Sequence, residues 1–205
     1  MKLNPRDLTR PHHFEVKGKR TLLLLHGTGG DEFDLVRLGQ MLDSQASLLS
    51  PRGLWVENGM NRFFERYPDG SFNEDSVRLA AEELRDFLEA ATLEYQLEPS
   101  NIYAAGFSNG ANTAAALLAL FPRALAGAML FGSTKPLKTI EAAPDLAGKR
   151  VWIANGDQDP YAPVSVTDVW AKELEGYGAT VSWLRHPGGH QISPAHIQQI
   201  SSDLA

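Results

Sequence analysis

The chain contains no cysteine among its 205 residues, and basic residues are in the minority. The absence of cysteine excludes disulfide bonds, thiolate metal ligands and a cysteine nucleophile. Lys and Arg number 19 against 25 Asp and Glu, so the formal net charge is −6. Nucleic acids and anionic membranes require a basic surface on their protein partners. We therefore expect that this chain neither binds nucleic acid nor associates stably with membranes.

Long apolar runs are also missing. Residues 1–16 carry positive charges, but no apolar segment follows them, so no secretory signal is predicted. The most apolar early run, residues 22–25, is too short to span a bilayer. The expectation is a cytoplasmic protein, either an enzyme or a binding protein.

The distribution of apolar residues along the chain predicts one α/β domain over residues 1–205. Short apolar segments alternate with helical patterns, which is typical of a mostly parallel sheet with helices on both faces. Strands are predicted at 21–27, 47–53, 101–107, 126–132, 150–156 and 179–185, with antiparallel edge material near 12–17.

Four helices are predicted between these strands. The longest is amphipathic, and Ser71 and Glu74 have the spacing of a capping box at its start. The other helices are expected at 112–121, 165–175 and 194–204. The apolar positions that recur at helical spacing in the longest helix are Val77, Ala80, Ala81, Leu84, Phe87, Leu88 and Ala91.

One motif points to chemistry. Residues 106–110 read Gly-Phe-Ser-Asn-Gly, a G-x-S-x-G pattern that follows a predicted strand and precedes a predicted helix. This is the context of a nucleophile elbow, in which Ser108 would be the nucleophile. The N–H of Asn109, at the helix start, would be free of an intrahelical partner. The alternative is an ordinary turn in which a serine lies between two glycines.

A nucleophilic serine needs a base and an orienting carboxylate. His186 and His190 both follow the last predicted strand, and His190 is favoured because two glycines place it on an exposed turn. Asp157 and Asp159 follow the strand at 150–156, in the order Ser, Asp, His that α/β-hydrolases have. Composition does not separate these two aspartates. Asp168 is a weaker third candidate because it falls in the next predicted helix.

The Gly-rich segment "HGTGGDE" at 26–32 follows the first main strand. Its backbone N–H groups could bind an oxyanion. A phosphate-binding loop is the other interpretation, but the segment matches neither G-x-x-x-x-G-K-[ST] nor G-x-G-x-x-G. Oxyanion binding is therefore preferred.

The segments "LLLLHGTGGDE", "GFSNGAN", "GDQDPYAP" and "PGGHQIS" resemble the small carboxylesterase/phospholipase group of α/β-hydrolases, which includes acyl-protein thioesterase-like enzymes. The chain looks closest to the bacterial hydrolases associated with hydroquinone and quinone resistance. The resemblance covers about residues 20–195. It implies an α/β-hydrolase fold, Ser108 as nucleophile, His190 as base and Asp159 as acid. It also implies that the backbone N–H groups of Thr28 and Asn109 bind the oxyanion.

The expected function is hydrolysis of carboxylic esters or thioesters, with short acyl or aryl groups, through an acyl-enzyme. Such chemistry needs no metal and no cofactor. The expected partner is a small-molecule ester, and a homodimer stays open. Two alternatives are a non-catalytic ligand-binding protein on the same fold, and a lysophospholipase or acyl-protein thioesterase with long-chain substrates.

The substrate site is expected to be shallow. Only residues 132–149 separate two neighbouring strands, too few for a cap domain. The aromatic loop at 55–72 would then form the wall of the site, with Met60, Phe63 and Phe64 as substrate contacts. Packing of these side chains against the sheet edge is an equal alternative. Arg62 and Arg66 could favour an acidic substrate, although exposed arginines are usually only solvated.

Overall fold

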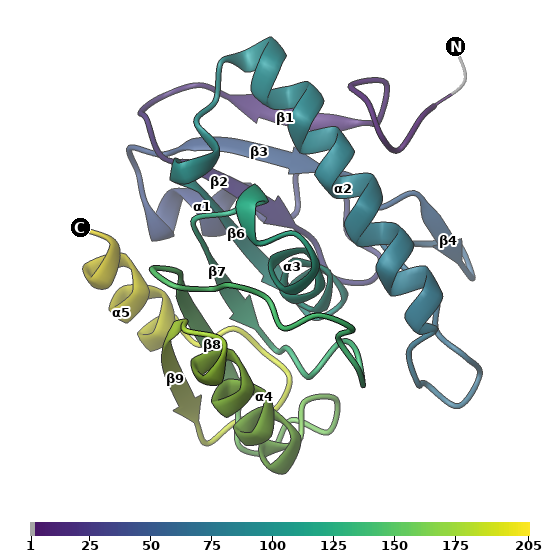
Figure 1. The fold of residues 1–205 in the computed structure, drawn as a ribbon, viewed down its shortest axis with the longest axis vertical. Coiled ribbons are helices and arrows are strands. Elements are labelled where there is room, and N and C mark those ends of the chain that lie inside the picture. Colours follow the sequence, from purple (N-terminus) through teal and green to yellow (C-terminus); the bar gives the residue numbers. More distant parts are fainter. Residues whose placement is uncertain (1–2) are drawn as a thin grey trace.

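The computed structural model describes residues 3–205, which form a seven-stranded sheet in the order β1-β3-β2-β6-β7-β8-β9 (Figure 1). The edge strand β1 pairs antiparallel with β3, and every other neighbouring pair is parallel. The predicted mostly parallel α/β sheet with an antiparallel edge is confirmed. The strands are β1 (His12–Glu15), β2 (Thr21–Leu25), β3 (Ser47–Pro51), β6 (Ile102–Phe107), β7 (Gly127–Phe131), β8 (Arg150–Gly156) and β9 (Thr180–His186).

Helices cover both faces of the sheet and create two cores. Along β2, Leu23 and Leu25 belong to one core and Leu22 and Leu24 to the other, because successive side chains of a strand point to opposite faces. The first core includes side chains of α2 (Glu74–Tyr95), α3 (Asn109–Leu120) and α4 (Val164–Gly176), and Figure 1 shows these helices in front of the sheet. The second core includes side chains of α1 (Val36–Leu42) and α5 (Pro194–Leu204).

Helix α2 buries the seven predicted apolar positions, but its start differs from the prediction. The N-cap is Asn73, whose side chain accepts a hydrogen bond from the Ser76 N–H at 3.3 Å. The Ser71 hydroxyl donates instead to Asp69 in the preceding turn, at 2.6 Å. The predicted capping box between Ser71 and Glu74 is therefore wrong, because the helix begins at Glu74 and this places Asn73, not Ser71, at the N-cap.

The segment between β3 and α2 contains a hairpin that the sequence pattern did not reveal. Strands β4 (Trp55–Glu57) and β5 (Met60–Arg62) pair antiparallel outside the main sheet. Helix α1 was not predicted either. Short 3-10 turns at Pro99–Asn101 and Pro122–Ala124 precede β6 and follow α3.

Residues 132–149 form no helix and no strand, so the connection between β7 and β8 carries no cap domain. The carboxyl ends of β6, β7 and β8 consequently stay uncovered by a helical lid. Within residues 3–205, every helix is too short or too polar to cross a membrane.

Candidate active site

Ser108 lies in the tight turn between β6 and α3, with φ 53° and ψ −114°. Few non-glycine residues adopt a positive φ, and holding one there costs of order 1–3 kcal/mol. The flanking glycines make the turn sterically feasible. A Cβ at Gly106 would lie 2.6 Å from the carbonyl carbon of Gly110, and one at Gly110 would lie 1.9 Å from the Leu25 oxygen. The G-x-S-x-G spacing thus follows from the close approach of β6, α3 and β2.

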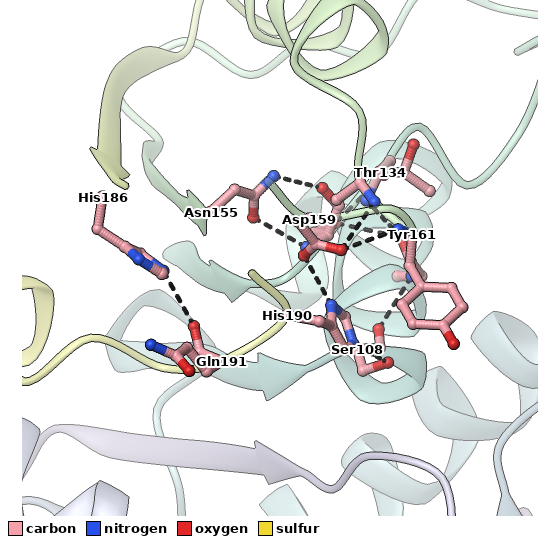
Figure 2. Close-up of polar contacts among 11 residues, drawn as sticks. Ser108, Thr134, Asn155, Asp159, Tyr161, His186, His190 and Gln191 are labelled. Carbon is pink, nitrogen blue, oxygen red and sulfur yellow. Dashed lines mark hydrogen bonds and ion pairs between the residues drawn. The ribbon is translucent and has the colours of Figure 1, made fainter. Parts of the chain in front are cut away.

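A chain of two hydrogen bonds links Ser108 to a buried carboxylate (Figure 2). The Ser108 hydroxyl lies 2.8 Å from Nε2 of His190, and Nδ1 of His190 lies 2.6 Å from Oδ2 of Asp159. Beside an ionised carboxylate, the imidazole proton resides on Nδ1, so Nε2 is free to accept the proton of the serine hydroxyl.

Asp159 is only 4% exposed, and its second oxygen is also occupied. Oδ1 accepts the backbone N–H groups of Tyr161 at 2.8 Å and Ala162 at 3.2 Å. These bonds hold the carboxylate in position after β8. Asp157, the other candidate in the same turn, points outward and pairs with Arg185 on the surface.

His186, the alternative base, does not contact Ser108. It lies at the end of β9 and is half-buried, and its ring nitrogens bond backbone groups of the turn that carries His190 (Figure 2). Asp168 lies in α4 and pairs with Lys172 one turn later. Of the histidines and aspartates that the sequence offered, the structure brings His190 and Asp159 to the serine.

The His190 ring is packed from two sides. The Phe107 ring centroid lies 4.9 Å from that of the imidazole, and the Tyr161 ring meets it edge-on at 5.0 Å. Tyr161 itself is 65% exposed. It therefore shields one side of the imidazole from water while remaining free to contact a ligand.

Two backbone donors next to Ser108 have no acceptor among residues 3–205: the N–H groups of Thr28 and Asn109. Asn109 is the first residue of α3, where N–H groups lack intrahelical partners. Hairpin β4–β5 holds the loop of Thr28 in place. The Gly29 N–H donates to the Asn61 carbonyl at 2.9 Å, and Arg62 Nη1 donates to the Thr28 hydroxyl at 2.6 Å.

His26, at the start of the same loop, has a structural environment. Its Nε2 accepts the Gly53 N–H at 2.9 Å, so the proton is on Nδ1 and donates to the Gly27 carbonyl at 2.7 Å. Burial lowers the pKa of His26 below its ordinary value, which keeps the ring neutral and both bonds intact.

A pocket of about 310 Å³ opens at Ser108. Its lining comes from hairpin β4–β5, from the loop before α2, from the start of α3 and from the turns that follow β2, β6, β7 and β8. The residues that line it are Thr28, Arg62, Arg66, Asp69, Gly70, Phe72, Ser108, Asn109, Asn112, Gly132, Pro160 and Tyr161.

The predicted wall of Met60, Phe63 and Phe64 does not line this pocket. Phe63 and Phe64 are 5% and 0% exposed and belong to the core beneath α2. Met60 is partly exposed; it lies on hairpin β4–β5 and packs beside Gly29 of the loop after β2. The substrate-contact prediction is wrong for Phe63 and Phe64, because packing them into the core removes two large aromatic surfaces from water.

The side chains that line the pocket in place of the predicted wall include Phe72, Tyr161, Arg62 and Arg66. The sequence had left the role of the two arginines open. Arg62 is 2% exposed, and its burial lowers its pKa to about 10, so it remains charged at neutral pH. One signal for its burial was available: an arginine directly before two core phenylalanines shares their surroundings. Nothing in the local pattern singles out Phe72 or Tyr161.

The described part of the chain contains no group of three or more His, Asp or Glu side chains arranged to hold a metal ion. The chemistry available at Ser108 is that of its hydroxyl, the imidazole, the buried carboxylate and the free N–H groups.

Known proteins resemble this chain in sequence and in fold. The profile of the Phospholipase/Carboxylesterase family matches residues 13–205. "Putative hydrolase MhqD" of Bacillus subtilis (strain 168) is 40% identical over 189 residues, which cover 91% of this chain and 94% of MhqD. The crystal structure of the Bacillus cereus carboxylesterase superposes with a TM-score of 0.90 at 41% identity, covering 95% of this chain and 93% of that one. The structure of YahD with malic acid has a TM-score of 0.88 at 25% identity, covering 95% and 98%.

Proposed function

Because the chain belongs to the phospholipase/carboxylesterase family of α/β-hydrolases, we propose that it cleaves carboxylic esters or thioesters by a Ser108-His190-Asp159 triad. The observation that carries this proposal is the continuous hydrogen-bond chain from the Ser108 hydroxyl through His190 to the buried Asp159. The carboxylesterase structure at 41% identity supports the ester class.

Each residue has one task in the proposed reaction. His190 Nε2 accepts the hydroxyl proton as Ser108 Oγ attacks the carbonyl carbon, and Asp159 stabilises the imidazolium that forms. The N–H groups of Thr28 and Asn109 bind the tetrahedral oxyanion. His190 then returns the proton to the leaving alcohol or thiol. Water hydrolyses the acyl-enzyme with His190 again acting as base.

The pocket favours a small substrate. Its volume of about 310 Å³ is at the lower end of the roughly 300–1,000 Å³ found for ligand pockets. Among its described lining residues, only Phe72, Pro160 and Tyr161 offer large apolar surfaces. A buried CH₂ contributes about 0.8 kcal/mol only where a wall covers it, so a long acyl chain gains little. YahD, a relative described with malic acid, supports a small ligand for this fold.

The test is hydrolysis of chromogenic short-chain esters together with covalent labelling. Ser108→Ala should lower kcat by roughly 10⁴-fold, as loss of a triad member does in other serine hydrolases. A serine-directed phosphonate should label Ser108 in the wild-type chain. Ser100→Ala, which removes an exposed serine, is the matched control and should keep full activity and labelling.

Two other functions would give different results. A non-catalytic binding protein would hydrolyse no ester and would leave the phosphonate unreacted. A long-chain lysophospholipase or thioesterase would prefer acyl chains of about twelve carbons over chains of about four. Cytoplasmic location remains a prediction from the sequence, and the oligomeric state, including a homodimer, stays open.

A further inference from the structure

Two guanidinium groups line the pocket of the proposed nucleophile. One comes from the end of hairpin β4–β5 and the other from the loop that follows the hairpin. Arg62 is the last residue of β5 and Arg66 follows four residues later. Arg62 is nearly inaccessible to water, whereas about a third of the Arg66 side chain is exposed. The same pocket is lined by Ser108, so one small molecule can reach both ends.

The two arginines share a single counter-charge, the half-buried carboxylate of Glu57. Oε2 of Glu57 lies 3.4 Å from Arg62 Nη1 and 3.1 Å from Arg66 Nη2. Two positive charges against one negative charge leave this cluster one positive charge in excess. The excess is local, because the chain as a whole carries a formal charge of −6.

A second carboxylate, Asp69, also lines the pocket but is held differently. It is exposed, and its Oδ1 accepts both the N–H and the hydroxyl of Ser71. These bonds lower its pKa, so it is ionised. Solvent screens an exposed charge far more than a buried one, so Asp69 offsets the arginine cluster only weakly.

Two side-chain donors of residues that line the pocket have no hydrogen-bond acceptor in the described part of the chain. Within residues 3–205, the buried Nε of Arg66 and the buried Nδ2 of Asn109 have no acceptor. Asn109 is 3% exposed, and its Oδ1 is already engaged by the Phe63 N–H at 2.7 Å. Leaving a buried donor unpaired costs about 1–3 kcal/mol, so such groups usually indicate a missing partner.

We infer that the substrate of this hydrolase carries a carboxylate, which binds Arg66 and the Arg62 charge behind it while the ester carbonyl lies at Ser108. A carboxylate provides two oxygens for a planar guanidinium and accepts hydrogen bonds without donating any. It thereby supplies a negative charge to the arginine cluster, which has one positive charge in excess. This inference rests on the proposed function, because it names the substrate class of the same site.

Matched ester pairs test the inference. One pair is 4-nitrophenyl hemiglutarate and 4-nitrophenyl pentanoate, which differ in a charge on the acyl chain. The other is 3-acetoxybenzoate and phenyl acetate, which differ in a charge on the leaving group. In at least one pair, kcat/KM for the anionic ester should exceed that for the neutral ester by about tenfold, the size of one charge-assisted hydrogen bond.

Two variants should move this ratio in opposite directions. Arg66→Gln removes one charge and should lower the anionic-to-neutral ratio by about tenfold. Glu57→Gln removes the shared counter-charge and should raise the ratio. Lys138→Gln is the matched control, because its side chain is 89% exposed and does not line the pocket. A preference for the neutral ester in both pairs, or a ratio that Arg66→Gln leaves unchanged, overturns the inference.

A binding measurement separates this inference from the catalytic proposal. Ser108→Ala should bind monomethyl glutarate in calorimetry, and adding Arg66→Gln should weaken the affinity by about tenfold. Binding that depends on Arg66, in a protein that hydrolyses no ester, contradicts the proposed catalysis but supports the carboxylate site. Absence of binding by Ser108→Ala overturns the carboxylate site, whether or not neutral esters are hydrolysed.

Discussion

Two regions form the pocket at Ser108, and they are built in different ways. The turns after β6 and β8, together with the turn after β9, present the polar side chains of Ser108, Asp159 and His190 to one point. The segment from β4 to α2 buries Phe63 and Phe64 and presents Arg62, Arg66 and Phe72 to the same pocket. Polar groups thus reach the pocket from both regions, while Phe63 and Phe64 pack the loop against the core.

The difference lies in what each region contributes to folding. The Ser108 turn is held at a positive φ and is strained. The loop, by contrast, buries Phe63 and Phe64, and its Arg62 donates to the Phe64 carbonyl. Substitutions in the turns after β6, β8 and β9 should therefore lower catalytic activity with little effect on stability. Substitutions of the buried residues between β4 and α2 should lower stability with little effect on catalysis.

The largest effect is expected at the carboxylate. Asp159→Asn should lower kcat by about 10⁴-fold, because an amide in place of Oδ2 favours the wrong tautomer of His190. The remaining oxygen can still accept the N–H groups of Tyr161 and Ala162, so the free energy of unfolding should change little. Steady-state kinetics and denaturant unfolding measure the two quantities.

Asp157→Asn is the control in the same turn. It removes only a surface ion pair with Arg185, and such pairs contribute about 0–1 kcal/mol. Its kcat should stay close to that of the wild type. Should Asp157→Asn be the more damaging of the two, the assignment of the acid to Asp159 would be incorrect.

The loop core should show the opposite behaviour. Phe64→Ala removes a fully buried ring that meets Phe72 edge-on at 5.0 Å, and should lower the free energy of unfolding by about 3–5 kcal/mol. Met60→Ala, on the partly exposed hairpin, is the matched control and should cost less than about 1 kcal/mol. Urea unfolding gives both values.

Because Phe64 does not line the pocket, the folded variant should keep KM near the wild-type value. A rise in KM with unchanged stability would restore Phe64 as a substrate contact and remove the contrast between the regions.

The smallest effect tests the strain at the nucleophile. Ser108→Gly and Ser108→Ala both remove the hydroxyl, but only glycine adopts a φ of 53° without steric cost. The glycine variant should be more stable to unfolding than the alanine variant by about 1 kcal/mol. Equal stability of the two inactive variants would show that the turn stores no strain.

Much of the fold could be predicted because its signals are local. The alternating strand and helix patterns, the seven buried positions of α2 and the stop before Pro122 all depend on neighbours in the chain. Hairpin β4–β5 and helix α1 were missed because their segments lack a regular apolar period. The cap of α2 was misplaced by two residues, since the helix begins at Glu74 and Asn73 lies directly before it.

By itself, the sequence determined that a serine follows a strand between two glycines, and that acidic and histidine-bearing turns follow later strands. Only the tertiary structure decided which of them meet. Two glycines favoured His190 over His186 in the sequence, but His190 lies 82 positions from Ser108 and 31 from Asp159, so its contacts with them depend on the fold. The same holds for the loop before α2. Which side chains of this loop face the pocket depends on the core that α2 and the sheet form beneath it, and burial of apolar surface in that core turned Phe63 and Phe64 inward.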